Sequence, residues 1–267
     1  MFENSNEGAQ GTWRRGETVR WQDLFVPVEA GLVWLGLITV AIAVAIGISG
    51  EIGVSKTAIQ QFAAGSTRQF VTKQLSMTTF YLVLLFFLWR IARRVDGAAL
   101  VARFRPIGWV SFAIALLGGV ALAFATTNLI SELATRSIVT FHVAPSEHNL
   151  VPSSPGELPY ALLAVSLAAP LAEEFYFRGV LLSWLSRKMF VPLAALLSAA
   201  VFALLHFRFV THPGPEGWVY SGVICFLGLT NATLALRTHS LWGPVAVHAG
   251  YNAALITMAA LAATHAF

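Results

Sequence analysis

Apolar stretches of nearly membrane-spanning length follow one another along almost the whole of this chain. About 20 consecutive apolar residues are needed for a helix to cross the hydrocarbon core of a bilayer. Hydrophobic residues make up 57% of the sequence and charged residues 11%, whereas about a quarter of a typical soluble domain is charged. The sequence therefore predicts an all-α, polytopic helical membrane protein. Seven stretches can serve as transmembrane helices: about residues 26–49, 76–92, 108–130, 158–182, 189–209, 218–236 and 241–263.

The predicted spans divide the chain into four parts. Residues 1–25 are polar and form an N-terminal segment outside the bilayer. Residues 26–130 hold three spans, and within them the segment 51–75 is too polar to cross but has the spaced apolar residues of an interfacial helix. If that segment does cross, the number of spans rises from seven to eight. A loop containing Pro, Ser and Gly at 131–157 then leads to a part with four spans at 158–263.

The basic residues indicate how the chain is oriented. With the N-terminus inside, most Lys and Arg residues near the span ends fall on the inner side, as the positive-inside rule requires. We therefore expect a cytoplasmic N-terminus, with the C-terminus outside for seven spans and inside for eight. The net charge of +4 reflects this topology, so we expect no nucleic-acid partner. The expected location is the cytoplasmic membrane of a bacterium, with the lipid bilayer as a partner.

Two adjacent glutamates interrupt the apolar run AAPLAEEFYFRGVLLSWL. A carboxylate at bilayer depth costs several kcal/mol, so an ionisable residue there indicates a functional site. Glu174 and Arg178 are four residues apart, share a helix face and can form an ion pair. Glu173 is rotated from them by about 100° and has no cation on its own helix. We therefore expect a structural pair beside one carboxylate that needs a different explanation.

Two further pairs of residues lie four positions apart in later apolar runs. Phe202 precedes His206, and His248 precedes Asn252. A carboxylate and a histidine can together activate water, neutral imidazole is a common metal ligand, and two donors one helical turn apart can hold an oxyanion. Each residue alone could instead join helices or pack in the core. Acidic, histidine and asparagine side chains on three helices together predict amide hydrolysis in a membrane cavity.

These pairs resemble the motifs of one known family, the CAAX protease and bacteriocin-processing family (CPBP, Abi) of intramembrane proteases. The resemblance covers about residues 158–263, predicts a four-helix catalytic core there, and extends to the type II CAAX prenyl endopeptidases. It implies an endopeptidase that cleaves a membrane-associated peptide or protein. Three motifs occur in order: EExxxR at Glu173 to Arg178, FxxxH at Phe202 to His206 and HxxxN at His248 to Asn252.

The resemblance also implies a role for each motif residue. The Glu173 carboxylate would activate water, with His206 assisting. The developing oxyanion would be stabilised by His248 and Asn252. The supporting residues of the motifs would be Glu174, Arg178 and Phe202.

Whether a metal takes part is a separate question, because the family has been described both as metal-dependent and as glutamate-dependent. This sequence has no HExxH helix, and its one cysteine, Cys225, excludes a Cys-based metal cluster. We therefore expect water activation without a metal and predict no required cofactor. A zinc site remains the alternative, with Glu173, His206 and His248 as candidate ligands.

Two other classes of function compete with a protease. One is a catalytically silent membrane scaffold or bacteriocin-immunity protein, and the complete set of motif residues argues against it. The other is a proton-coupled transporter that uses the buried carboxylates as a relay. The sequence shows no internal repeat, which argues against the inverted-repeat architecture of many transporters.

The predicted spans place the motif residues at different depths. Glu173 lies near the middle of its run, whereas His206 lies near the outer end of the run at 189–209. His248 lies nearer the inner side. A rise of about 1.5 Å per residue makes these offsets several Å. If the residues share one site, either the helices tilt or the fifth helix starts deeper than predicted.

Overall fold

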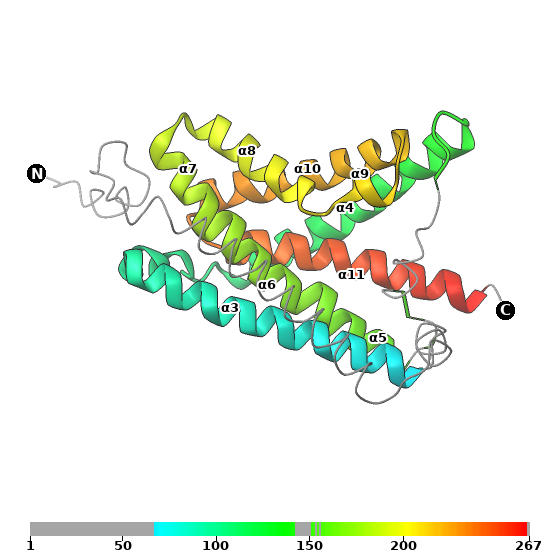
Figure 1. Cartoon of the computed structure of the whole chain (residues 1–267), viewed down its shortest axis with the longest axis horizontal. Helices are drawn as coiled ribbons and strands as arrows, with labels where there is room; N and C mark the ends of the chain where they lie inside the picture. Colours follow the sequence, from blue (N-terminus) through cyan, green and yellow to red (C-terminus); the bar gives the residue numbers. More distant parts are fainter. Residues whose placement is uncertain (1–66, 142–150, 153, 155, 266–267) are drawn as a thin grey trace, which may run out of the picture.

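The computed structural model of the chain describes residues 67–141, 151–152, 154 and 156–265. Every regular element in these ranges is a helix (Figure 1), which confirms the all-α prediction for this part of the chain. The predicted polar segment at 1–25, the first predicted span at 26–49 and most of the predicted interfacial segment at 51–75 lie outside these ranges.

The described helices vary widely in length, and one long helix is divided by two π-helical segments. Their bounds, in chain order, are α3 Thr67–Arg103, α4 Trp109–Thr135, α5 Leu158–Ala161, η2 Leu162–Ala168, α6 Ala169–Glu174, η3 Phe175–Leu181, α7 Leu182–Lys188, α8 Val191–Leu204, α9 Arg208–Thr211, α10 Pro215–Thr238 and α11 Trp242–His265. The elements from α5 to α7 form one continuous helix, Leu158–Lys188, in which η2 and η3 flank the α6 segment that carries both glutamates.

Among the described residues, four helices are long and apolar enough to cross a membrane: Trp109–Thr135, Leu158–Lys188, Pro215–Thr238 and Trp242–Ala262. They correspond to four of the predicted spans, and they fit an integral membrane protein. The predicted span at 76–92 lies inside α3, whose C-terminal side chains fall outside the described set. The total of seven or eight spans therefore stays a prediction.

The span predicted at 189–209 is wrong in its extent. Helix α8 has only 14 residues, about 21 Å of helix, which is shorter than the hydrocarbon core of about 30 Å. The backbone leaves the helix at Leu205 and reaches a left-handed conformation at Phe207, with φ of 51°. The apolar run continues past this turn, so hydropathy alone did not reveal it. The fifth predicted span is thus a short helix followed by a turn and the one-turn helix α9.

The end of α8 depends on a side chain of the FxxxH motif. The His206 backbone N–H donates to the carbonyl of Ala203, three residues back, instead of continuing the α-helical pattern. In a continued α-helix this N–H would donate to the carbonyl of Phe202, four residues back. That carbonyl oxygen instead lies 2.8 Å from His206 Nδ1. The histidine ring therefore replaces the backbone donor at the helix end. Irregular backbone at membrane depth is tolerated where it lines a cavity, which is where His206 lies.

The helices pack around α11, which runs between the group of α3 and α5 to α7 and the group of α4, α8 and α10 (Figure 1). Helix α11 contacts α4, α10, η2 and α6, while α3 contacts η2, α6 and η3. Helix α8 packs on α10 and η3. The two glutamates of α6 and the motif residues of α11 consequently face the same interior.

Two glycines allow α4 and α11 to approach backbone to backbone. A Cβ added at Gly119 would collide with the carbonyl oxygen of Val247, and a Cβ added at Gly250 would collide with that of Leu116. Small residues at helix contacts are the usual means of close approach in membranes. On α11 the contact involves Val247, Gly250 and Tyr251, which adjoin His248 and Asn252, so it positions the part of α11 that carries the third motif.

Candidate active site

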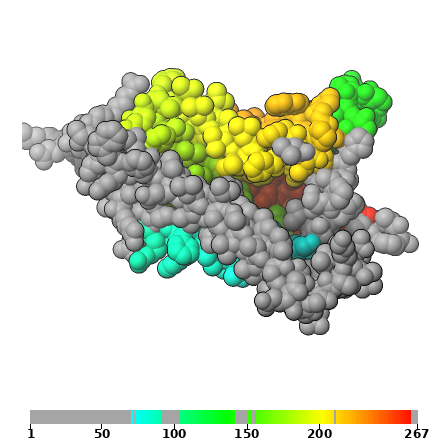
Figure 2. Space-filling view, viewed as in Figure 1, coloured from blue at the N-terminus to red at the C-terminus, as the bar shows by residue number. Residues whose placement is uncertain are grey.

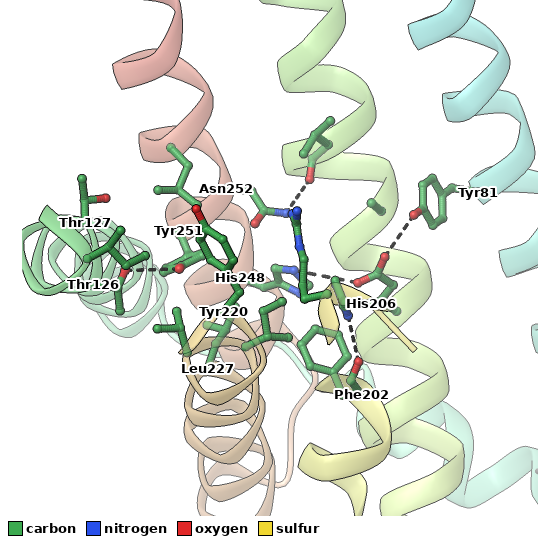
Figure 3. Close-up of a pocket in the computed structure, with 18 of the residues that line it drawn as sticks. Tyr81, Thr126, Thr127, Phe202, His206, Tyr220, Leu227, His248, Tyr251 and Asn252 are labelled. Carbon is green, nitrogen blue, oxygen red and sulfur yellow. Dashed lines mark hydrogen bonds and ion pairs between the residues drawn. The ribbon is translucent and has the colours of Figure 1, made fainter. Parts of the chain in front are cut away.

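One cavity of about 340 Å³ contains all four residues predicted to be catalytic. Its lining includes Glu173 from α6, His206 from the turn after α8, and His248 and Asn252 from α11. Figure 2 shows a recess beneath α8 and α9 with α11 at its base, and Figure 3 shows the histidines and Asn252 around the cavity. The offset in depth predicted from the spans therefore does not keep His206 apart from the other three residues.

The two adjacent glutamates have different surroundings. Glu173 lines the cavity, and its side chain is 12% exposed. Its Oε1 accepts a hydrogen bond of 3.1 Å from the Tyr81 hydroxyl, and its Oε2 lies 3.9 Å from His248 Nε2. Glu174 is completely buried and does not line the cavity. The one-residue rotation along the helix therefore separates a carboxylate at the cavity from a carboxylate in the core.

Glu174 Oε1 is the centre of a buried polar network. It accepts hydrogen bonds from Arg178 Nη1 at 3.1 Å and Asn231 Nδ2 at 2.9 Å, and it lies 2.8 Å from His248 Nδ1. The predicted pairing of Glu174 with Arg178 is thus present, with both side chains fully buried. Arg178 Nη2 also donates to the Gly228 carbonyl of α10 at 2.8 Å. The network ties α6, η3, α10 and α11 together.

The position of Glu174 determines the tautomer of His248. A carboxylate only accepts hydrogen bonds when ionised, so His248 Nδ1 must carry the proton of the bond of 2.8 Å. Nε2 then faces Glu173 across 3.9 Å, which is too long for a direct hydrogen bond. A second proton on Nε2 would make the ring a cation.

His206 is oriented by a carbonyl near the end of α8. Since the Phe202 carbonyl can only accept, His206 Nδ1 carries the proton of the bond of 2.8 Å. This leaves Nε2 as the nitrogen with a lone pair for the cavity. The Phe202 ring is fully buried and contacts both histidines edge-on, with centroids 4.6 Å from His206 and 5.6 Å from His248. Phe202 therefore packs against both imidazoles.

Asn252 is anchored by a carbonyl that the π-helical segment η2 makes available. The Ala169 N–H donates to Ala164 O, five residues back, and Pro170 has no N–H. Val165 O consequently lacks both helical donors, and it accepts a hydrogen bond of 2.8 Å from Asn252 Nδ2. One N–H of the amide is engaged in this way, and a primary amide has two. The side chain is thus held in place with donor capacity left for the cavity.

Several polar residues of the site were missed at the sequence level, among them Tyr81, Arg208 and Asn231. Tyr81 and Arg208 line the cavity, and Asn231 donates to Glu174 from the fully buried face of α10. Each lies inside an apolar run, which is the signal that could have identified them. The guanidinium of Arg208 lies 5.7 Å from the Tyr220 ring centroid.

The zinc alternative requires three ligands that converge on one point. Within the described ranges, no three His, Cys, Asp or Glu side chains are placed to share an ion. His206 Nδ1 and His248 Nδ1 are engaged with Phe202 O and Glu174, respectively. Zinc-binding histidines usually ligate through Nε2 while Nδ1 bonds a carbonyl or carboxylate in this way, so zinc stays the alternative, and no chemical step is assigned to it.

Comparison with known proteins bears on the same part of the chain. The model of the family described as type II CAAX prenyl endopeptidase Rce1-like matches residues 155–254. No curated protein and no solved structure matches the chain. The matched range contains all three motifs and excludes α3 and α4. The resemblance expected from the motifs is thereby confirmed for this part of the chain: residues 155–254 are similar to the Rce1-like type II CAAX prenyl endopeptidases.

Proposed function

We propose that this protein is an intramembrane endopeptidase that hydrolyses a peptide bond of a membrane-associated peptide or protein. One observation carries the proposal: Glu173, His206, His248 and Asn252, from three separate segments, line a single cavity. The cavity wall is otherwise largely apolar, with side chains such as Val223 and Leu227. A few convergent polar groups in an apolar pocket are typical of an active site.

Water activation is assigned to Glu173 and His206. A water molecule near Glu173 Oε2 would give its proton to the carboxylate, and the lone pair on His206 Nε2 would orient it. The water oxygen forms a bond to the carbonyl carbon of the substrate, and the carbonyl oxygen becomes an oxyanion. When the C–N bond breaks, Glu173 returns the proton to the departing amine. Protons and charges balance over the cycle without a further reactant.

Oxyanion stabilisation is assigned to His248 and Asn252. They lie one helical turn apart on α11 and both line the cavity. His248 Nε2, when protonated, and the second N–H of the Asn252 amide supply two donors. Donors held in fixed positions stabilise a developing charge without reorganisation. Glu174 supports this role because its hydrogen bond to Nδ1 orients the imidazole, and Arg178 and Asn231 in turn hold Glu174.

The direct test compares the membrane proteome of cells that carry the wild-type protein with that of cells that carry Glu173→Gln. A matched control is Glu132→Gln, which removes an exposed glutamate on α4 that does not line the cavity. We expect one or more membrane-associated proteins to be shortened with the wild type and the control but intact with Glu173→Gln. Identical proteomes for all three proteins would contradict a protease and favour a silent scaffold.

A separate measurement, of proton flux across a membrane, tests the transporter alternative. A proton relay through Glu173 would make proton flux into liposomes depend on this carboxylate, whereas a protease would not. We expect proteoliposomes of wild-type protein and Glu173→Gln to show the same proton permeability. Proton flux that is lost only in Glu173→Gln, without any cleaved substrate, would favour the transporter.

A further inference from the structure

The Tyr81 hydroxyl brings a polar group of α3 into the cavity. It donates to Glu173 Oε1 at 3.1 Å from 92 positions earlier in the sequence, and both side chains line the cavity. Helix α3 lies outside the matched range 155–254. We propose that Tyr81 is a positioning residue for the Glu173 carboxylate, so that the active site is incomplete without α3. This inference rests on the proposed function.

The direction of the Tyr81 hydroxyl is fixed by apolar packing. Tyr81, Leu84 and Leu88 recur at helical spacing on one face of α3, and the two leucines are 3% and 1% exposed. The Tyr81 ring packs against the cluster that contains these leucines together with Ala172 and Phe175, which flank the glutamate pair. The ring therefore cannot turn without disturbing this core, and its hydroxyl remains directed at Glu173.

The hydrogen bond from Tyr81 distinguishes the two oxygens of Glu173. The terminal torsion of a glutamate is broad, so an unrestrained carboxylate can exchange its oxygens by rotation. The bond to Oε1 limits that rotation, and Oε2 then faces His248 Nε2 at 3.9 Å. Oε2 is the oxygen left to receive the proton of the attacking water. Tyr81 thus sets the geometry of the base without touching the substrate.

A purely structural reading of the same contact makes a different prediction. Buried hydroxyls usually have a hydrogen-bond partner, and Tyr81 could use Glu173 only to satisfy this need. In that case its removal would lower stability and leave the turnover of folded protein unchanged. In the positioning reading, its removal lowers turnover even where stability is unaffected, because a small displacement of a reacting group has a large effect on rate.

The first experiment measures turnover, KM and thermal stability of Tyr81→Phe in the full chain, on a substrate identified by the proteomic comparison. Tyr160→Phe is the matched control, because it removes the same hydroxyl from a residue on α5 that is 37% exposed and does not line the cavity. We expect kcat of Tyr81→Phe to fall by about 10- to 100-fold, with little change in KM, and the control to match the wild type. An unchanged kcat per folded molecule overturns the inference.

A second experiment remains decisive if Tyr81→Phe folds poorly. Fluorinated tyrosines of graded acidity at position 81 keep the ring and change only the strength of the donor. We expect log kcat to change steadily with donor acidity, whereas a structural role gives one constant value and overturns the inference. Failure of this inference can be told apart from failure of the proposed function. If Glu173→Gln cleaves the substrate normally, the proposed function is wrong. If Glu173→Gln is inactive and Tyr81→Phe cleaves normally, only the role of Tyr81 is wrong.

Discussion

His248 Nδ1 lies 2.8 Å from Glu174 Oε1, although the two residues are 74 positions apart in the sequence. The same oxygen also accepts hydrogen bonds from Arg178 and Asn231. The hydrogen bond that orients the imidazole therefore belongs to a network whose members come from four helical segments. A hydrogen bond to one ring nitrogen of a histidine fixes the tautomer and the orientation of the ring. The core carboxylate therefore connects the stability of the helix bundle to the chemistry of the cavity.

Loss of Arg178 should destabilise the protein because it leaves the Glu174 carboxylate buried without its cation. We expect Arg178→Ala to lower the free energy of unfolding by about 3 to 5 kcal/mol, the range for buried pairs in soluble proteins. The double variant Glu174→Gln with Arg178→Gln should recover part of that loss, because no charge is then stranded. Unfolding in detergent measures both changes.

Arg136→Ala supplies the control for this experiment. Arg136 pairs with Glu132 at the same four-residue spacing, but the two side chains are 68% and 57% exposed. Exposed pairs contribute little to stability, so this variant should unfold like the wild type. A double variant that is no more stable than Arg178→Ala would exclude a significant contribution from the buried pair.

The close contact of α4 with α11 gives a second prediction. Gly119→Ala places a methyl group against the Val247 backbone and should destabilise the protein, whereas the adjacent Gly118→Ala meets no atom within 4 Å. Because alanine favours helix over glycine by about 1 kcal/mol in a helix interior, Gly118→Ala should be neutral or stabilising. Thermal unfolding compares the stabilities of the two variants. Equal stabilities would contradict the close packing of α4 against α11.

The sequence predicted those parts of the site that depend on spacing within one helix. The four-residue interval placed Glu174 with Arg178, and the rotation between adjacent residues separated Glu173 from that pair. Partners on distant helices could not be predicted, because nothing local links Asn252 to Val165 or Glu173 to Tyr81. The early end of α8 was missed for a related reason. It depends on a histidine side chain, and the apolar residues continue beyond it.

Asn252 should show a loss of turnover that exceeds any loss of stability. One oxyanion donor typically contributes about 100- to 1000-fold to kcat, so we expect Asn252→Ala to lower kcat by that factor with little change in KM. Asn128→Ala is the control, because its exposed amide also donates to a helical carbonyl, that of Phe124, outside the cavity. A decrease only in proportion to folded protein would show that Asn252 merely joins helices.

Metal removal tests the assignment of water activation to the protein's own side chains. We expect proteolysis to survive prolonged chelation and elemental analysis to find less than one zinc ion per molecule. Loss of activity with a chelator, restored by one divalent ion, would contradict this expectation. Glu173, His206 and His248 would then become the ligands to test by substitution.

The central claim is that the Glu173 carboxylate activates the water that cleaves the peptide bond. The measurement that tests it most directly is the turnover of purified Glu173→Gln beside Glu132→Gln on one identified substrate, with folding verified by thermal unfolding. General-base catalysis contributes about 100- to 10,000-fold, so kcat of folded Glu173→Gln should fall by at least about 100-fold while the control keeps the wild-type rate. Cleavage by Glu173→Gln at the wild-type rate would contradict the account.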